Sequence, residues 1–117
     1  MDHYKYVISE HLNHYGTLYG GNLLNWIDEV GYITASIEFP NCRFVTVALK
    51  DVEFRHRIEL GSVLVFSVNN IRTGNSSVTY TVKVFSALEK LRETVLFETD
   101  ITFVNVDENG NKAKIFA

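Results

Sequence analysis

Two polar side chains, Asn13 and Asp28, and a pair of glycines between them could carry out chemistry together. The pair Gly20 and Gly21 breaks regular structure, and from Asn22 the spacing of apolar residues predicts a helix. Backbone N–H groups at the start of a helix lack intrahelical acceptors and carry partial positive charge. This stretch therefore predicts a site for a carbonyl or an oxygen anion, with a carboxylate further along the helix.

Asp28 lies within an apolar helical run and has two interpretations. Its neighbours at helical spacing include Leu24, Gly31 and Ala35, which form a low apolar strip beside the carboxylate. Such a strip has room for a narrow acyl or pantetheine chain. In the alternative interpretation, Asp28 and Glu29 are the solvated side of an amphipathic helix; the helix alone favours this one, and the wider pattern described below favours the first.

The pattern around the helix predicts an α+β domain that spans residues 1–117, with one antiparallel sheet. The helix should run from Asn22 to Glu38, because Pro40 disfavours helical structure in the residue before it. Strand propensity and turn residues place the remaining elements. They are an extended edge piece at 5–10, a long strand at 43–57 with a bend near Lys50 and Asp51, a hairpin of strands at 62–72 and 77–87, a charged turn at 89–93, and a last strand at 94–106.

A single helix covers only one face of such a sheet. Between Val63 and Phe66 neighbouring apolar side chains point to opposite faces, so the second face is partly apolar. In the next strand that face carries Thr79, Thr81 and Lys83. This mixture predicts contacts with other subunits, and hence an oligomer.

Composition excludes several classes of protein. The net charge is −3 and the basic residues are scattered, which argues against a nucleic-acid binder. A single cysteine, Cys42, cannot form an internal disulfide and indicates a reducing, cytoplasmic setting. The first residues lack the apolar region of a signal peptide, and no apolar run is long enough to span a membrane. We expect a soluble, cytoplasmic protein.

The histidines and Cys42 are candidates for a metal site or a nucleophile. The histidines lack the usual ligand spacing near a Cys or an acidic residue, and Cys42 lacks a Cys-His-Asn context. We therefore expect no metal. The histidines are His3, His11, His14 and His56.

The block Asn-x-x-Gly-Thr-x-Tyr-Gly-Gly at 13–21, followed by a helix with Asp28, resembles the hotdog-fold acyl-CoA thioesterases. The likeness is greatest to bacterial acyl-CoA hydrolases and the related brain-type enzymes, and it extends to 44–48 and 102–110. It implies a hotdog fold, one long central helix wrapped by an antiparallel sheet of about five strands. It also implies that Asp28 is the catalytic carboxylate and that Asn13 polarises the thioester or orients water. Coenzyme A is then part of the substrate, and no separate cofactor is expected.

Thioester hydrolysis needs a base or nucleophile and donors for the oxyanion. Asp28 and the N–H groups near Gly20 and Gly21 have these properties, but seven helical residues separate Gly21 from Asp28 by about 10 Å. Two antiparallel helices across a two-fold axis would bring one subunit's glycines to the other subunit's Asp28. The homodimer is then the minimum active unit, and the family resemblance implies a trimer of dimers.

Two further segments are candidates for contacts with coenzyme A. Turn N–H groups and hydroxyls at Gly74, Asn75, Ser76 and Ser77 could meet pantetheine or phosphate, and Arg55, His56 and Arg57 could meet phosphate. Each also has a simpler interpretation, since a Gly-Asn hairpin and a basic strand end need no ligand.

Two other functions compete with hydrolysis. A non-catalytic acyl-CoA-binding or sensing module would use the same groove, although such a module gains nothing from the Asp28 carboxylate beside a thioester. Hotdog dehydratases are the other class, and the chain lacks their Gly-Asp-x-Asn-Pro-x-x-His stretch.

Overall fold

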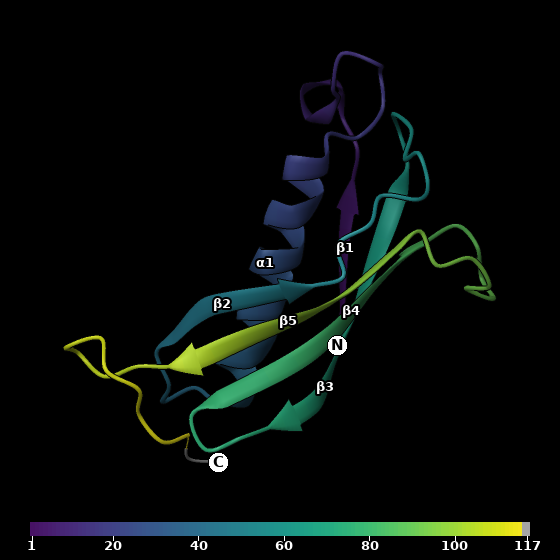
Figure 1. The fold of residues 1–117 in the computed structure, drawn as a ribbon. Coiled ribbons are helices and arrows are strands. Elements are labelled where there is room, and N and C mark those ends of the chain that lie inside the picture. Colours follow the sequence, from purple (N-terminus) through teal and green to yellow (C-terminus); the bar gives the residue numbers. More distant parts are fainter. Residues whose placement is uncertain (116–117) are drawn as a thin grey trace.

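The computed structural model describes residues 1–115, and it consists of one antiparallel sheet with one long helix on a single face (Figure 1). The predicted α+β class is confirmed. The spatial order of the strands is β1-β3-β4-β5-β2, so that β1 and β2 form the two edges. The strands are β1 (Asp2–Tyr6), β2 (Phe44–Lys50), β3 (Val63–Thr73), β4 (Ser77–Ser86) and β5 (Phe97–Asn105).

The helix α1 (Gly20–Glu38) buries one stripe against the sheet. Its buried side chains recur at intervals of three and four residues, as expected for a helix with one apolar face. They are Leu23, Ile27, Val30, Thr34 and Ala35. The helix begins two residues before the predicted start, since Tyr19 is its N-cap and both Asn22 and Leu23 donate their N–H to the Tyr19 carbonyl. The two glycines therefore form its first turn.

The last turn of α1 is fixed to the sheet by Tyr80. This fully buried side chain on β4 donates its hydroxyl to Glu38 Oε1 at 2.7 Å. Burial, with the Glu38 carboxylate beside it, raises the pKa of Tyr80 far above its usual value. The hydroxyl therefore stays protonated and remains a hydrogen-bond donor at physiological pH.

The strand predicted at 43–57 is too long. The strand β2 ends at Lys50, and the next residue, Asp51, has a φ of 54°, in the left-handed region that extended strands do not use. Residues 51–57 lie outside the sheet as an exposed segment. The bend near Lys50 and Asp51 is real, but it terminates the strand and does not merely redirect it.

The ends of other elements also shift. The first strand, β1, occupies Asp2–Tyr6 and not 5–10, and a 3-10 helix, η1 (Ser9–His11), follows it. Its predicted place at a sheet edge is confirmed. The hairpin is confirmed as β3 and β4, and the last strand is shorter than predicted.

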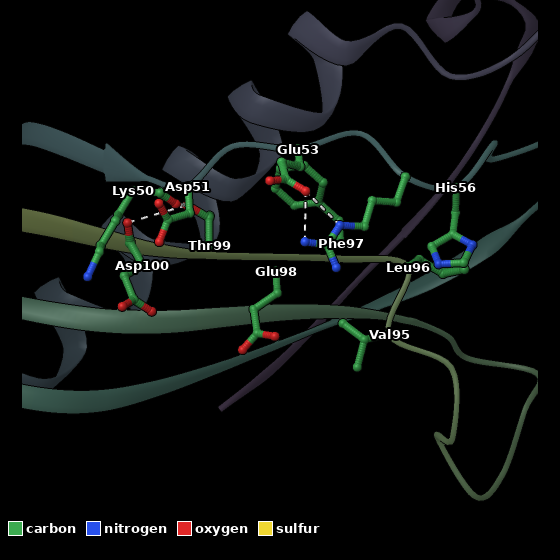
Figure 2. Close-up of a pocket in the computed structure, with 11 residues that line it drawn as sticks. Lys50, Asp51, Glu53, His56, Val95, Leu96, Phe97, Glu98, Thr99 and Asp100 are labelled. Atoms are coloured by element: carbon green, nitrogen blue, oxygen red, sulfur yellow. Dashed lines mark hydrogen bonds and ion pairs between the residues drawn. The ribbon is translucent and has the colours of Figure 1, made fainter.

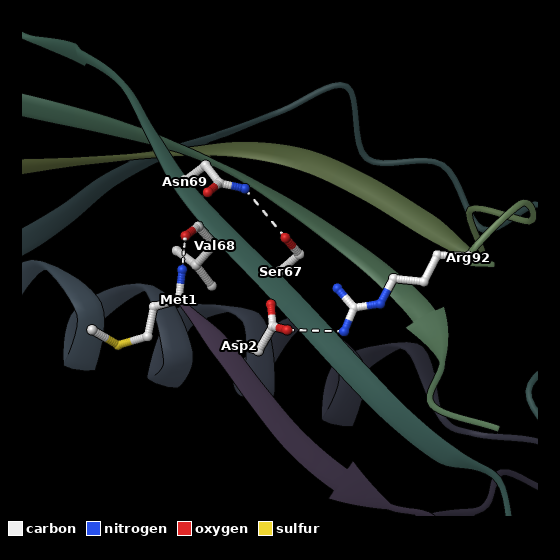
Figure 3. Close-up of polar contacts among 6 residues, drawn as sticks. All are labelled: Met1, Asp2, Ser67, Val68, Asn69 and Arg92. Carbon is white, nitrogen blue, oxygen red and sulfur yellow. Dashed lines mark hydrogen bonds and ion pairs between the residues drawn. The ribbon is translucent and has the colours of Figure 1, made fainter. Parts of the chain in front are cut away.

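The sheet face away from α1 has the predicted mixed character. On β4, Thr79, Thr81 and Lys83 are partly exposed, while their neighbours Val78, Tyr80, Val82 and Val84 are buried under the helix. A loop at 87–96 connects β4 to β5. From that loop Arg92 reaches Asp2 on β1, with 2.9 Å between Nη2 and Oδ2 (Figure 3). Its guanidinium also lies 5.7 Å from the centroid of the Phe85 ring.

The two edge strands are β1 and β2, and each has one side without a partner strand among the described residues. Within residues 1–115, the outer edge of β2 pairs with no other strand, and Val45 and Val47 on this strand are exposed.

In the same described range, no helix has the length and apolar character needed to cross a membrane.

Candidate active site

Asn13 builds the turn that precedes α1. Its side-chain oxygen accepts the N–H groups of Tyr15 at 2.9 Å and Thr17 at 3.2 Å, and its own N–H donates to the Thr17 carbonyl at 2.8 Å. These bonds use the oxygen of the amide. The Nδ2 group donates to no acceptor within the described residues 1–115. One half of the side chain is therefore structural, and the other half is available to a ligand.

The start of α1 offers two further free donors. The N–H groups of Gly20 and Gly21 have no acceptor among the described residues, whereas the next two N–H groups bond to Tyr19. The first turn is held in place by His11, whose carbonyl accepts the Tyr19 N–H at 2.9 Å and Asn22 Nδ2 at 3.0 Å. Fixed, unpaired N–H groups at a helix start favour a negatively charged oxygen.

Neighbouring aromatic rings lie close to the two glycines. A β-carbon at Gly20 would lie 3.0 Å from Cζ of Phe54, and one at Gly21 would lie 2.6 Å from Cε2 of Tyr19. Any larger residue would displace these rings. Both rings, Tyr19 and Phe54, are about half exposed.

A cavity of about 480 Å³ opens at this helix start. Its apolar wall contains Leu18, Leu23, Phe54 and Ile58, and its polar wall includes Asn13. Three predicted groups thus meet in one chain: the amide of Asn13, the first helical turn at Gly20, and the basic triplet Arg55, His56 and Arg57.

The two arginines of the triplet differ in their availability. Arg55 is paired with Glu53, with 2.7 Å between Nη2 and Oε2, in an exposed pair. Arg57 forms no ion pair with any residue in the range 1–115. Arg57 is therefore the arginine whose charge is not already neutralised.

Asp28 lies apart from this cavity. It is exposed, does not line the cavity, and lies eight residues beyond Gly20, which is about 12 Å along a helix. Its Oδ1 accepts a hydrogen bond from Thr46 Oγ1 on β2 at 2.5 Å. Asp28 therefore lies beside β2, an edge strand of the sheet.

The hairpin at 74–77 is not brought to the cavity within one chain. Figure 1 shows the turn between β3 and β4 at the opposite end of the fold from the start of α1. Gly74 donates its N–H to the Ser77 carbonyl at 2.7 Å, while the carbonyls of Asn75 and Ser76 accept from Ile115 and Asn105. Its contact with coenzyme A stays a prediction.

The other candidate residues have structural surroundings. His11 packs edge-on against Trp26, with ring centroids 4.8 Å apart, and its Nδ1 accepts the Ile8 N–H at 3.1 Å. Cys42 packs against the core beside the end of α1. Within residues 1–115, no three His, Cys, Asp or Glu side chains are grouped so that they could hold a metal ion.

Sequence reasoning missed Thr46 and Phe54. The alternation of side chains along β2 could have placed Thr46 on the helix side of the sheet, because residues two apart share a face and Phe44 is buried toward the helix. No comparable signal marked Phe54, since residues 51–57 were expected to be strand and its contact with Gly20 is a tertiary one.

Five antiparallel strands in this order, packed on one long helix whose first turn offers free donors, define a hotdog domain. The chain belongs to the thioesterase superfamily, whose family model matches residues 15–93. It is 35% identical over 80 residues to the mouse protein acyl-coenzyme A thioesterase 11; the match covers 68% of this chain but only 13% of the mouse protein.

Two solved structures are similar over nearly the whole chain. A hexameric thioesterase from Yersinia pestis is 27% identical with a TM-score of 0.85, and the match covers 97% of this chain and 93% of that one. An acyl-CoA hydrolase from Staphylococcus aureus, in complex with butyryl coenzyme A and coenzyme A, is 25% identical with a TM-score of 0.83. That match covers 98% of this chain and 68% of the hydrolase.

Proposed function

We propose that this protein is an acyl-CoA thioesterase that hydrolyses its substrate to coenzyme A and a carboxylic acid in a site shared between two subunits. One observation carries the proposal: the helix start provides unpaired donors in a cavity, at Asn13 and Gly20, while the exposed Asp28 carboxylate lies beside the edge strand β2. Membership of the thioesterase superfamily and the butyryl coenzyme A bound to the Staphylococcus aureus relative support the choice of substrate.

The open edge of β2 supports a dimer. An unpaired strand with exposed Val45 and Val47 is a template for pairing with another chain. Antiparallel pairing of two β2 strands about a two-fold axis would make the two helices antiparallel. Each subunit's Asp28 would then approach the first helical turn of its partner. The hexameric assembly of the Yersinia pestis relative favours a trimer of such dimers.

In the proposed reaction Asp28 acts first as a base and then as an acid. Asp28 takes a proton from a water molecule as the water oxygen attacks the thioester carbon. The carbonyl oxygen becomes an oxyanion that accepts hydrogen bonds from Asn13 Nδ2 and the N–H groups of Gly20 and Gly21 of the partner. When this intermediate collapses, the C–S bond breaks and the sulfur of coenzyme A leaves with the proton from Asp28.

A second route has the same starting groups. The Asp28 carboxylate attacks the thioester carbon directly and forms an anhydride, which water then hydrolyses. A single turnover in ¹⁸O-labelled water distinguishes the routes. The anhydride route predicts that solvent oxygen enters the Asp28 side chain, whereas the general-base route predicts that it enters only the released acid.

Contacts with the rest of coenzyme A are proposed for two segments. Arg57 and His56, at the rim of the cavity, suit phosphate oxygens, with Arg55 shared between Glu53 and the ligand. The turn at 74–77 requires a neighbouring subunit to supply the cavity, because it lies far from the cavity of its own chain.

Asn13 variants separate the structural half of the amide from the catalytic half. The Asn13→Asp variant keeps an oxygen acceptor for Tyr15 and Thr17 but removes the Nδ2 donor. We expect it to keep the wild-type melting temperature and to lose about 10²-fold or more in kcat, the usual cost of an oxyanion donor. Asn13→Ala should lower both. Full activity in Asn13→Asp would remove the amide from the mechanism.

Thr46 is a positioning residue for Asp28. The Thr46→Val variant removes the donor to Asp28 and should lower kcat by roughly tenfold, since a hydrogen bond to a charged group orients it. The KM should stay unchanged because Thr46 is not assigned to substrate binding. The Thr46→Ser variant keeps the hydroxyl and should restore kcat. If Thr46→Val raises only KM, the assignment is wrong.

The function itself is tested by measuring free thiol released from acetyl-CoA through palmitoyl-CoA. Release from at least one acyl-CoA is expected. The absence of release from every acyl-CoA, together with saturable binding of acyl-CoA, would instead favour the non-catalytic binding module.

A further inference from the structure

Phe54 occupies an unusual position at the start of α1. Its ring lies against Gly20, where a β-carbon would be only 3.0 Å from Cζ, and it packs against Phe97 with 5.3 Å between ring centroids. Despite these two contacts the side chain is 55% exposed. A large apolar ring half exposed beside two free N–H donors is placed to contact whatever binds there.

The pair Phe54 and Phe97 separates two cavities. Phe54 lines the cavity of about 480 Å³, together with the buried side chains of Leu18, Leu23 and Ile58. Phe97 lines a second cavity of about 320 Å³, whose apolar part continues through Val95 and Leu96 (Figure 2). Arg55 and His56 line both cavities. The ring of Phe54 therefore stands at the boundary.

The rim of the second cavity is charged. Its lining includes Glu98 and Asp100 on β5, and also Lys50, Glu53 and Arg55 (Figure 2). An acyl chain that enters this cavity would therefore lie against Val95, Leu96 and Phe97, the apolar residues of its lining.

The segment that carries Phe54 is weakly held. All residues in 51–57 are exposed. Among residues 1–115, this segment forms hydrogen bonds only within itself, between Arg55 and Glu53. Moving the ring thus breaks ring contacts with Gly20 and Phe97 but no hydrogen bond to the rest of the fold.

We propose that Phe54 determines the length of acyl chain that the site accepts. This inference rests on the proposed function. With the thioester carbonyl on the N–H groups of the first helical turn, the acyl chain meets the ring that covers Gly20. A short acyl group ends against the ring, whereas a longer one extends toward Phe97 and Leu96 only after the ring moves aside.

The test compares kcat/KM for acyl-CoA substrates of increasing length in two opposite variants. Phe54→Ala opens the boundary, and each newly buried methylene contributes about fourfold. We expect the ratio of dodecanoyl-CoA to butyryl-CoA hydrolysis to rise by about tenfold or more, since that corresponds to roughly two methylenes. Phe54→Trp, with a larger ring, should lower the same ratio.

A matched control is Tyr6→Ala. Tyr6 is an aromatic residue of similar size on β1, 63% exposed and outside both cavities. Its replacement should leave the ratio unchanged. Melting temperatures are measured alongside, and if Phe54→Ala does not fold, Phe54→Leu replaces it beside Phe54→Trp.

The outcomes separate the two proposals. Equal changes at all chain lengths, or an unchanged ratio in a folded Phe54 variant, would overturn the role of Phe54 while the thioesterase assignment stands. A wild-type protein that hydrolyses no acyl-CoA would overturn the proposed function instead. The role of Phe54 is then decided by calorimetric titration with non-hydrolysable thioether analogues of butyryl-CoA and dodecanoyl-CoA, where the affinity ratio should shift as above.

Discussion

The Asp28→Asn variant should lose acyl-CoA hydrolysis by a factor of roughly 10²–10⁴ in kcat, because it removes the only proposed acceptor for the proton of water. Its fold should be intact. Asp28 is exposed, and the asparagine oxygen can still accept the Thr46 hydroxyl. The measurement is thiol release under saturating acyl-CoA, with thermal unfolding recorded on the same samples.

The neighbouring residue gives the control. Glu29 is an equally exposed carboxylate on α1, and it pairs with Lys5 at 2.7 Å, on a different face from Thr46. The Glu29→Gln variant should retain wild-type kcat. Activity that survives Asp28→Asn would keep the enzyme but remove Asp28 from the mechanism, and equal losses in both variants would indicate a general effect of charge.

Mixing two inactive variants should restore activity. In a dimer of Asp28→Asn and Asn13→Asp subunits, one shared site contains both defects and the other contains none. Random exchange of subunits places half of the dimers in this mixed form, so about a quarter of wild-type activity should return. A dimer isolated with a different affinity tag on each subunit should have about half.

This experiment decides whether the site is shared. If Asp28 and Asn13 of the same chain acted together, each site of the mixed dimer would have one defect and no activity would return. Mixing each variant with itself, under the same exchange conditions, provides the baseline. Subunit exchange is verified by the tags before activity is measured.

The sequence predicted those parts of the fold that depend on local pattern. The apolar spacing of α1 and the alternation in β4 are strong signals, and both were confirmed. The predicted helix start, Asn22, is two residues too late, because glycine is a poor helix former. In the structure the Tyr19 carbonyl accepts the N–H groups of Asn22 and Leu23, so the helix begins at Gly20.

A local backbone conformation and several long-range contacts account for what was missed. The strand β2 ends at Lys50 because Asp51 has a left-handed backbone conformation. An aspartate can adopt this conformation, and the pattern of apolar residues around it does not predict it. The bond from Thr46 to Asp28 depends on how β2 lies over the helix. The predicted roles of Arg57 and of the turn at 74–77 concern a ligand and a second chain, which local pattern does not encode.

The unpaired edge of β2 also has a consequence for how this protein behaves on dilution. Seven residues of extended backbone with two exposed valines gain their missing partners only from another molecule. With the active site shared between subunits as proposed, mass action would govern catalysis as well as assembly, so specific activity per chain should fall below a threshold protein concentration and recover on reconcentration.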